Sequence, residues 1–220
     1  MDKILSLAYQ NTKDYESIDL LSSDVIDVSL DNYPNLLQIR ISKCEQVTKV
    51  KLSNMPKLQV IDLLDNKNLE EVEISNCPSL TTIEAGFNLK LKKIDGIQHI
   101  KYFSAPHCNE LKDIPTLPNA IFLDYSCHSL DYEKIINGSP NLECFVGSFT
   151  KEIKLSDITK HQSLKILQIS STKLNCDSIT PGTSLKIIIF NKPDKYTELC
   201  TGDQNLLKNF YVTDSNQTNQ

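Results

Sequence analysis

Residues 36–66 read LLQIRISKCEQVTKVKLSNMPKLQVIDLLDN and contain one pattern twice. The first copy is Leu36-x-x-Ile39-x-Ile41-x-x-Cys44, and the second, one repeat later, is Leu58-x-x-Ile61-x-Leu63-x-x-Asn66. Apolar residues that alternate with polar ones indicate a short strand with one buried face. Because a single strand cannot bury that face alone, the copies are expected to stack into a parallel sheet over one continuous core.

The pattern recurs along the chain at a nearly constant spacing. Its leading apolar residue returns at intervals of 22, 22, 20, 20, 22, 22, 21 and 22. These leading residues are Leu36, Leu58, Leu80, Ile100, Ala120, Leu142, Leu164, Leu185 and Leu207. Two further full copies end at Asn88 and Cys108. The spacing therefore predicts about nine repeats.

This pattern resembles that of the leucine-rich repeat family, L-x-x-L-x-L-x-x-N/C-x-L with about 20–29 residues per unit. The resemblance covers roughly residues 25–213 and is most specific in the first four repeats. It implies an α/β solenoid, a leucine-rich-repeat horseshoe. Its concave face would be a parallel β-sheet, and its convex face would carry extended or short helical segments.

The last position of the pattern predicts a structural ladder of four side chains, Cys44, Asn66, Asn88 and Cys108. Stacking places them in one column, where each can bond backbone groups of a neighbouring turn. Buried loop backbone needs such partners. We expect a structural role for these four side chains and no reactive one.

A second apolar pattern lies half a repeat out of step with the first. It is Val25-x-x-Val28-x-Leu30, Val47-x-x-Val50-x-Leu52 and Leu69-x-x-Val72-x-Ile74. Either set could line the continuous sheet. The first set alone persists through all units, so we assign it to the concave sheet and the second to the convex side. Residues 130–138 indicate a short helix that ends at a glycine.

The two ends differ from the middle. Ile4, Leu7 and Ala8 would share one face of a short helix over residues 2–14. We expect an N-terminal cap over residues 1–24, the solenoid over 25–213, and a disordered polar tail over 214–220.

Composition restricts the compartment and the partner. The net charge is −5 and the pI about 5.4, and only Arg40 among the 23 basic residues is an arginine. This argues against a nucleic-acid-binding protein. No apolar run could span a membrane. The seven cysteines are scattered, with no metal-ligand spacing, which favours a reducing compartment. We expect a cytoplasmic protein, or one delivered into a host cytosol, without metal or cofactor.

The outward positions of the sheet, and positions just beyond its strands, supply candidate partner-binding residues. Arg40 is followed by the acidic residues Asp62, Asp65 and Glu84, and then by Phe87, Tyr102, His107 and Phe122. Aromatic residues beside charges are typical of protein-binding surfaces. A solvated charged column without a ligand is the alternative. Outward aliphatic residues follow at Val146, Ile166, Ile187 and Ile189. They indicate a covered surface, a binding surface, or a register that is one residue out of step.

The sequence does not indicate an enzyme. Adjacent His107 and Cys108 point to opposite faces of a strand, and only six glycines and no nucleotide-binding or hydrolase motif are present.

We expect a non-catalytic module that recognises another protein through the concave face, as a monomer or in a hetero-complex. One alternative is a microbial effector acting in a host cell, because residues 111–118 resemble the proline-containing repeats of bacterial effectors. Another is a structural subunit of a larger assembly.

Overall fold

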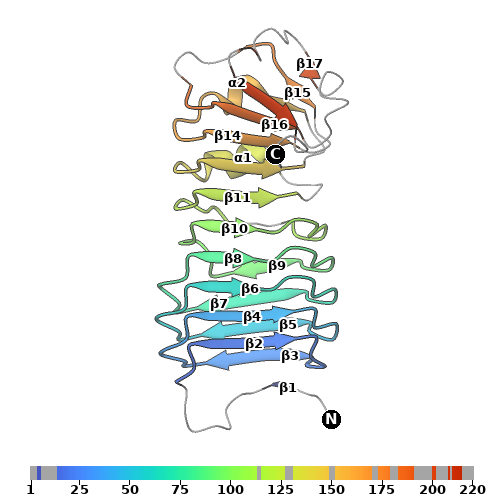
Figure 1. Cartoon of the computed structure of the whole chain (residues 1–220), viewed down its shortest axis with the longest axis vertical. Coiled ribbons are helices and arrows are strands. Elements are labelled where there is room, and N and C mark those ends of the chain that lie inside the picture. The colour runs from blue at the N-terminus through green and yellow to red at the C-terminus, as the bar shows by residue number, and fades with distance from the viewer. Residues whose placement is uncertain are drawn as a thin grey trace. The chain divides into compact units, whose positions relative to one another are not determined.

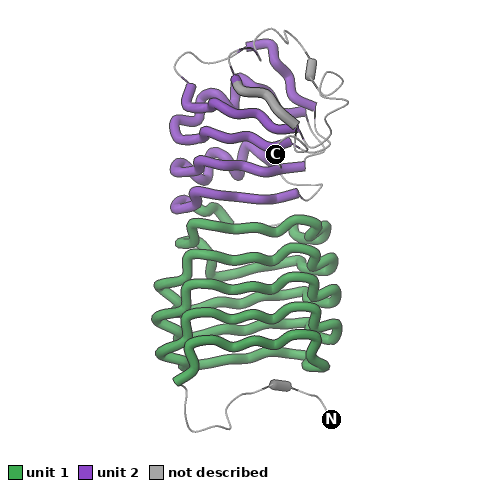
Figure 2. Tube along the Cα trace, viewed as in Figure 1, with its two compact units in different colours: residues 1–117 green, residues 118–220 purple. Residues whose placement is uncertain are grey.

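The structure is a computed structural model of the chain. It describes residues 4–5, 14–112, 115–126, 131–148, 152–169, 173–178, 183–190, 200–201, 208 and 210–214. The chain divides into two compact units, residues 1–117 (unit 1) and residues 118–220 (unit 2), which Figure 2 shows in different colours. Each unit is described by itself.

Unit 1 is a parallel β-solenoid with two sheets. The first sheet has the order β2-β4-β6-β8-β10, and the second has the order β1-β3-β5-β7-β9. Strands of the two sheets run in opposite directions, as the arrowheads in Figure 1 show. The strands are β1 (Ile4–Leu5), β2 (Ser17–Leu21), β3 (Asp27–Asp31), β4 (Gln38–Ser42), β5 (Lys49–Ser53), β6 (Val60–Asp62), β7 (Glu71–Ser75), β8 (Thr82–Glu84), β9 (Lys93–Asp95) and β10 (Tyr102–Ser104).

The expected solenoid is therefore present, but its second side differs from the expected convex layer. Between residues 27 and 95 the second apolar pattern forms strands of a continuous sheet and no helix. Val50 and Leu52 of β5 are as deeply buried as Ile39 and Ile41 of β4. Both halves of a repeat carry the same alternation, so both bury one face of a strand against the same core.

Each half-turn passes through one residue with left-handed backbone. At one edge this residue is asparagine three times, in Asn32 (φ 61°), Asn54 (φ 57°) and Asn76 (φ 53°). Its backbone N–H donates a hydrogen bond to a carbonyl of the next repeat, as Asn54 N does to Ser75 O at 3.1 Å. Asparagine tolerates this conformation better than most residues. The local sequence thus specifies where the chain turns.

Gly96 allows the one contracted turn in the described part of unit 1. Its φ is +83°, and a Cβ atom placed there would lie 1.8 Å from the carbonyl oxygen of Ile74. In the preceding repeat, Val72 is followed by two more buried residues, Ile74 and then Cys77. In the repeat that contains Gly96, the corresponding Ile94 is followed directly by the buried Ile97, with only two residues between them. This explains why the interval from Leu80 to Ile100 is 20 residues and not 22.

Unit 2 keeps the first sheet and partly replaces the second. One sheet has the order β18-β16-β14-β12-β11, and a smaller one has the order β13-β15-β17. The elements are β11 (Phe122–Tyr125), α1 (Tyr132–Asn137), β12 (Cys144–Gly147), β13 (Ile153–Lys154), α2 (Leu155–Ile158), β14 (Ile166–Ile169), β15 (Leu174–Asn175), β16 (Ile187–Phe190), β17 (Cys200–Thr201) and β18 (Tyr211–Asp214).

One sequence prediction for unit 2 is confirmed, and one question that the sequence left open is answered. The helix expected over 130–138 is α1, whose first turn is capped by Asp131 through a 3.0 Å bond from Glu133 N and which is followed by Gly138. The register of the late repeats, which the sequence left open, keeps the alternation of the first four repeats. Phe145, Leu167 and Ile188 lie opposite one another in successive strands and are fully buried.

The predictions for the chain ends fare differently. Ile4–Leu5 is strand β1, paired in parallel with β3, so a helix through these residues is wrong. A few apolar residues in a short segment suit either element, and pairing with an existing sheet decides between them. Asp214 ends β18 and is not part of a free tail. Residues 2–3 and 6–13 of the expected helix and residues 215–220 lie outside the described residues, and Asp14 is not helical.

Candidate binding face

The four predicted ladder residues lie in one buried column at one edge of unit 1. Asn66 Oδ1 accepts a 2.9 Å bond from Cys44 N, and Asn66 Nδ2 donates to Ile41 O (2.6 Å) and Leu63 O (2.8 Å). Asn88 repeats this arrangement one turn further, with Asn66 N as its donor at 2.8 Å. Both asparagines are fully buried. Their amides therefore satisfy backbone groups that have no strand partner.

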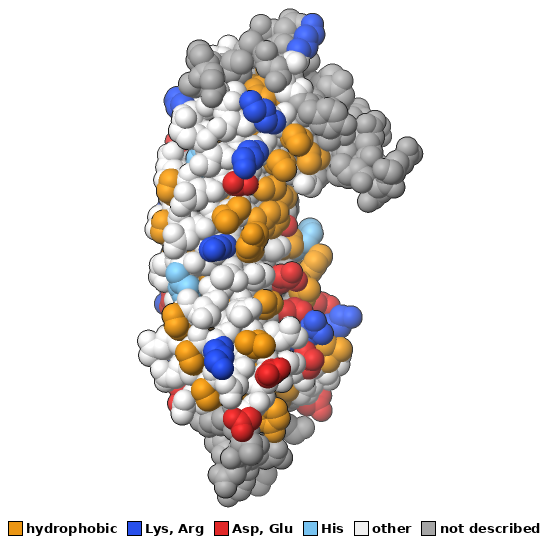
Figure 3. Space-filling model, turned by 60° about the vertical axis from the view of Figure 1, so that its left-hand side comes forward, with side chains coloured by type: hydrophobic (Ala, Val, Ile, Leu, Met, Phe, Trp, Pro, Cys, Tyr) orange, Lys and Arg blue, Asp and Glu red, His pale blue; other side chains and the backbone are white. Residues whose placement is uncertain are grey.

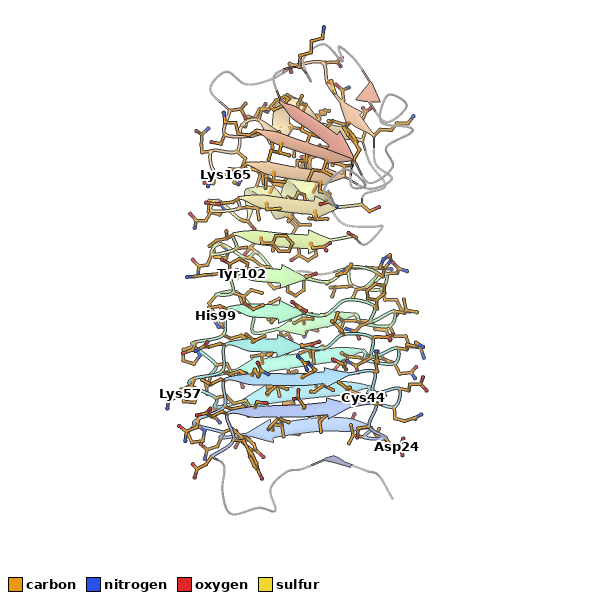
Figure 4. The ribbon with its side chains drawn as sticks, in the orientation of Figure 1. Asp24, Cys44, Lys57, His99, Tyr102 and Lys165 are labelled. Atoms are coloured by element: carbon orange, nitrogen blue, oxygen red, sulfur yellow. The ribbon has the colours of Figure 1, made fainter. Side chains whose placement is uncertain are left out.

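Cysteine replaces asparagine in the column before and after these two. Cys44 Sγ donates to Leu20 O at 3.3 Å, and Cys108 Sγ donates to Ala85 O at 2.9 Å. Both thiols are fully buried. Figure 4 places Cys44 at the edge opposite to the one that carries Lys57 and His99. These contacts are structural, and neither thiol is accessible to a substrate.

The outward face of the first sheet carries a column of charged side chains in register. Asp19 lies opposite Arg40, Arg40 opposite Asp62, and Asp62 opposite Glu84. Arg40 bonds Asp62 Oδ2 through Nε at 3.0 Å and lies 3.7 Å from Asp19 Oδ1. Within the described residues the Glu84 side chain has no hydrogen bond or ion pair. The column thus ends in one carboxylate that has no counter-charge.

Asp65, Phe87 and His107 do not lie on strands. They occupy the left-handed position of three successive turns, with φ of 58°, 63° and 60°. The Phe87 and His107 rings are stacked, with centroids 4.8 Å apart and an interplanar angle of 27°. Phe87 is 48% exposed, and Leu89 beside it is 47% exposed. We call Phe87, Leu89 and His107 the aromatic corner.

The remaining predicted residues lie apart from this corner. Tyr102 begins β10, is 45% exposed, and is labelled in Figure 4. Phe122 belongs to β11 of unit 2 and is half-buried. The structure therefore brings together Arg40 with Asp62, and Phe87 with His107.

The outward face of the second sheet has a different electrostatic character. All eight charged side chains on β3, β5, β7 and β9 have a partner within the described residues. Lys49 Nζ, for example, binds Glu73 Oε1 at 2.6 Å and Glu71 Oε2 at 3.1 Å. The hydrogen bond from Lys49 holds the pKa of Glu73 below its ordinary value of 4.5. Charges one repeat apart and opposite in sign would have indicated this self-paired face from the sequence.

In unit 2 the outward row nearest the strand starts is apolar. Phe122, Cys144, Ile166 and Ile187 lie opposite one another, and all four are half-buried. Burial raises the pKa of the Cys144 thiol to about 11, and the Asp124 carboxylate adds to this effect. The thiol is therefore protonated at neutral pH and is a poor nucleophile.

A surface hollow of about 320 Å³ lies beside Asp65. Asp24, Lys43, Glu45 and Lys67 also line it, so its charges are mixed. Figure 3 likewise shows acidic, basic and hydrophobic side chains interspersed on the face it displays. Across the ranges given above for the described residues, no three His, Cys, Asp or Glu side chains converge to hold a metal ion. No helix in those ranges is both long and apolar enough to cross a membrane.

No protein-family model matches the chain, and comparisons with curated proteins and with solved structures found no match.

Proposed function

We propose that the chain is a non-catalytic protein-binding module that recognises a partner through the outward face of the first sheet in unit 1. The contrast between the two faces supports this proposal. Every charged side chain on β3, β5, β7 and β9 has a partner within the described residues, whereas Glu84 of the first sheet has none there. The aromatic side chains Tyr102, on the first sheet, and Phe87, just beyond it, are also exposed. Exposed rings beside uncompensated charge are what a protein partner can bury favourably.

The leucine-rich-repeat assignment and the concave shape of this face are part of the same proposal. The asparagine and cysteine column agrees with the repeat pattern, and the second sheet of unit 1 is the main departure from the expected convex layer. A cytoplasmic location, or delivery into a host cytosol as an effector, is compatible with this function.

A structural subunit is a second candidate, supported by a different observation. The apolar row of Phe122, Cys144, Ile166 and Ile187 in unit 2 is half-buried and continuous in register. Such a row is a natural contact in a permanent assembly. An obligate subunit would aggregate or self-associate when purified alone, and sedimentation velocity measures this directly.

Affinity capture with matched variants tests the leading proposal. Glu84→Lys combined with Tyr102→Ala alters the first face at two exposed side chains, whereas Glu71→Lys alters the second face. Circular dichroism establishes that both variants fold. We expect the captured partner to be lost with the first variant and kept with the second. The proposal is wrong if both variants keep the partner equally.

A further inference from the structure

The outward face of the first sheet already binds one cationic side chain, that of Arg40. The Arg40 guanidinium lies between two carboxylates of neighbouring strands, Asp19 and Asp62. A planar guanidinium suits this position because its fork of donors matches carboxylate oxygens. The charged column continues to Glu84, and the next residue in register is Ser104. Glu84 therefore occupies the place of Asp62 without the arginine that Asp62 has.

The aromatic corner lies just beyond Glu84 along the chain. A cation above an exposed aromatic ring is attracted by the negative face of the ring. The Phe87 and His107 rings are stacked, and Phe87 is 48% exposed, so the ring pair offers an aromatic surface to such a cation. Asp65, one turn before Phe87 at the same left-handed position, has no hydrogen bond or ion pair of its side chain among the described residues.

Phe87 is an unfavourable choice for its left-handed backbone position. The opposite edge uses Asn32, Asn54 and Asn76 at the equivalent left-handed position. A phenylalanine there is less favourable than a residue that tolerates this conformation. Stacking on His107 offsets part of that cost. An exposed ring held in an unfavourable conformation is better explained by a binding role than by stability.

We propose that the partner presents an arginine side chain to this surface, with its guanidinium paired to Glu84 and packed against the Phe87–His107 rings. The inference rests on the proposed function and specifies the chemistry of the partner. Asp65 adds negative charge beside the ring pair and orients a basic segment along the corner. On the second sheet the carboxylates of β7 and β9 are already paired with lysines. Those of β3 accept hydrogen bonds from Thr48, Ser53 and Asn54.

Peptide binding to the purified chain tests this inference without knowledge of the natural partner. The probes are a fluorescently labelled tetra-arginine peptide and a matched tetra-lysine peptide, measured by anisotropy at low ionic strength. We expect the arginine peptide to bind at least about threefold more tightly, because lysine lacks the planar fork.

Three variants locate the binding. Glu84→Gln and Phe87→Asn should each weaken the arginine peptide at least about fivefold, which corresponds to about 1 kcal/mol. Glu71→Gln changes the net charge equally but lies on the second sheet, and it should change affinity less than about twofold. Phe87→Asn should also leave the melting temperature unchanged or raise it, since asparagine suits the left-handed position.

Several results would overturn the inference. One is the absence of arginine-peptide binding to the wild-type chain, and another is equal loss in Glu84→Gln and Glu71→Gln. A third is equal affinity for the two peptides. If the peptides fail while the captured partner still depends on Glu84 and Tyr102, the inference about arginine is wrong and the proposed function stands. If that partner is also indifferent to Glu84 and Tyr102, the proposed function is wrong as well.

Discussion

Replacement of Asn66 by alanine tests whether the buried amide ladder holds the turns of unit 1 together. The change removes the acceptor for Cys44 N and both donors, to Ile41 O and Leu63 O. Leu63 O keeps a second donor, Asn88 Nδ2, at 2.9 Å. The N–H of Cys44 and the carbonyl of Ile41 lose this partner in residues that are fully buried.

The magnitude follows from these two groups. A buried polar group left unsatisfied costs about 1–3 kcal/mol, so the two groups together should lower the free energy of unfolding of Asn66→Ala by about 2–6 kcal/mol. The free energy of unfolding of Asn66→Cys should lie between that of Asn66→Ala and that of the wild type. A thiol can donate to the preceding turn, as Cys108 does to Ala85 O, but it is a poor acceptor for Cys44 N.

Asn68→Ala is the matched control. Asn68 lies in the same turn, is half-buried, and donates a hydrogen bond to Glu45 O at 2.7 Å. Its replacement should cost less than about 1 kcal/mol, since water can satisfy the freed groups. Chemical denaturation followed by far-ultraviolet circular dichroism measures all three variants. The ladder argument is refuted if Asn66→Ala and Asn68→Ala unfold at the same denaturant concentration with the same slope.

Single positions elsewhere give three more tests. Gly96→Ala should destabilise the chain by about 3 kcal/mol or more, because the added Cβ would lie 1.8 Å from the Ile74 carbonyl oxygen. Thermal melting measures this, and an unchanged melting temperature would contradict the tight-turn explanation. Cys144 should react with iodoacetamide about 100-fold more slowly than a free thiol at pH 8, because its pKa is about 11. Asp124→Asn should speed the reaction, and equal rates in the folded and the denatured chain would contradict the raised pKa. Glu73 has a lowered pKa in the folded chain, so its contribution to stability is present above pH 4.5 and is lost as the pH falls through the lowered value. Glu73→Gln should therefore reduce the loss of stability at acid pH, and an unchanged loss would show that Lys49 does not bind Glu73 in solution.

The inward positions were predictable because burial is periodic. Ile39, Ile61 and Ile83 alternate with polar residues and recur once in every repeat, and each is at most 1% exposed. The same reasoning extended correctly to Phe145 and Leu167, where the outward residues are also apolar. A fixed register keeps every side chain on its own face.

The second sheet was missed because its pattern weakens along the chain. Val50 and Val72 repeat as regularly as Ile39 and Ile61, but the half-repeats after residue 126 contain α1 and α2. Only the first pattern persists along the whole chain, which favours it as the one continuous sheet. Within unit 1 the two patterns are equally regular, which favours a sheet for each of them. Local pattern strength was the better guide there, since every half-turn must bury one strand face.

The candidate site was only partly predictable. Asp62 and Glu84 lie on the outward face and Asp65 and Phe87 lie just beyond the strands, as expected. The left-handed backbone that Asp65, Phe87 and His107 share was not predicted. A period-two pattern has no information about a residue with positive φ beyond the end of the strand.

By itself the sequence determined the repeat, the inward residues and the buried asparagine and cysteine column, because these depend on burial and on local backbone needs that recur in every repeat. The tertiary structure alone decided that both halves of each early repeat form sheets, that the charged side chains of the second sheet find partners on it or beside it, and that Phe87 stacks on His107. These features depend on which side chains from different turns come into contact, and contact across turns is set by register and stacking rather than by any single repeat.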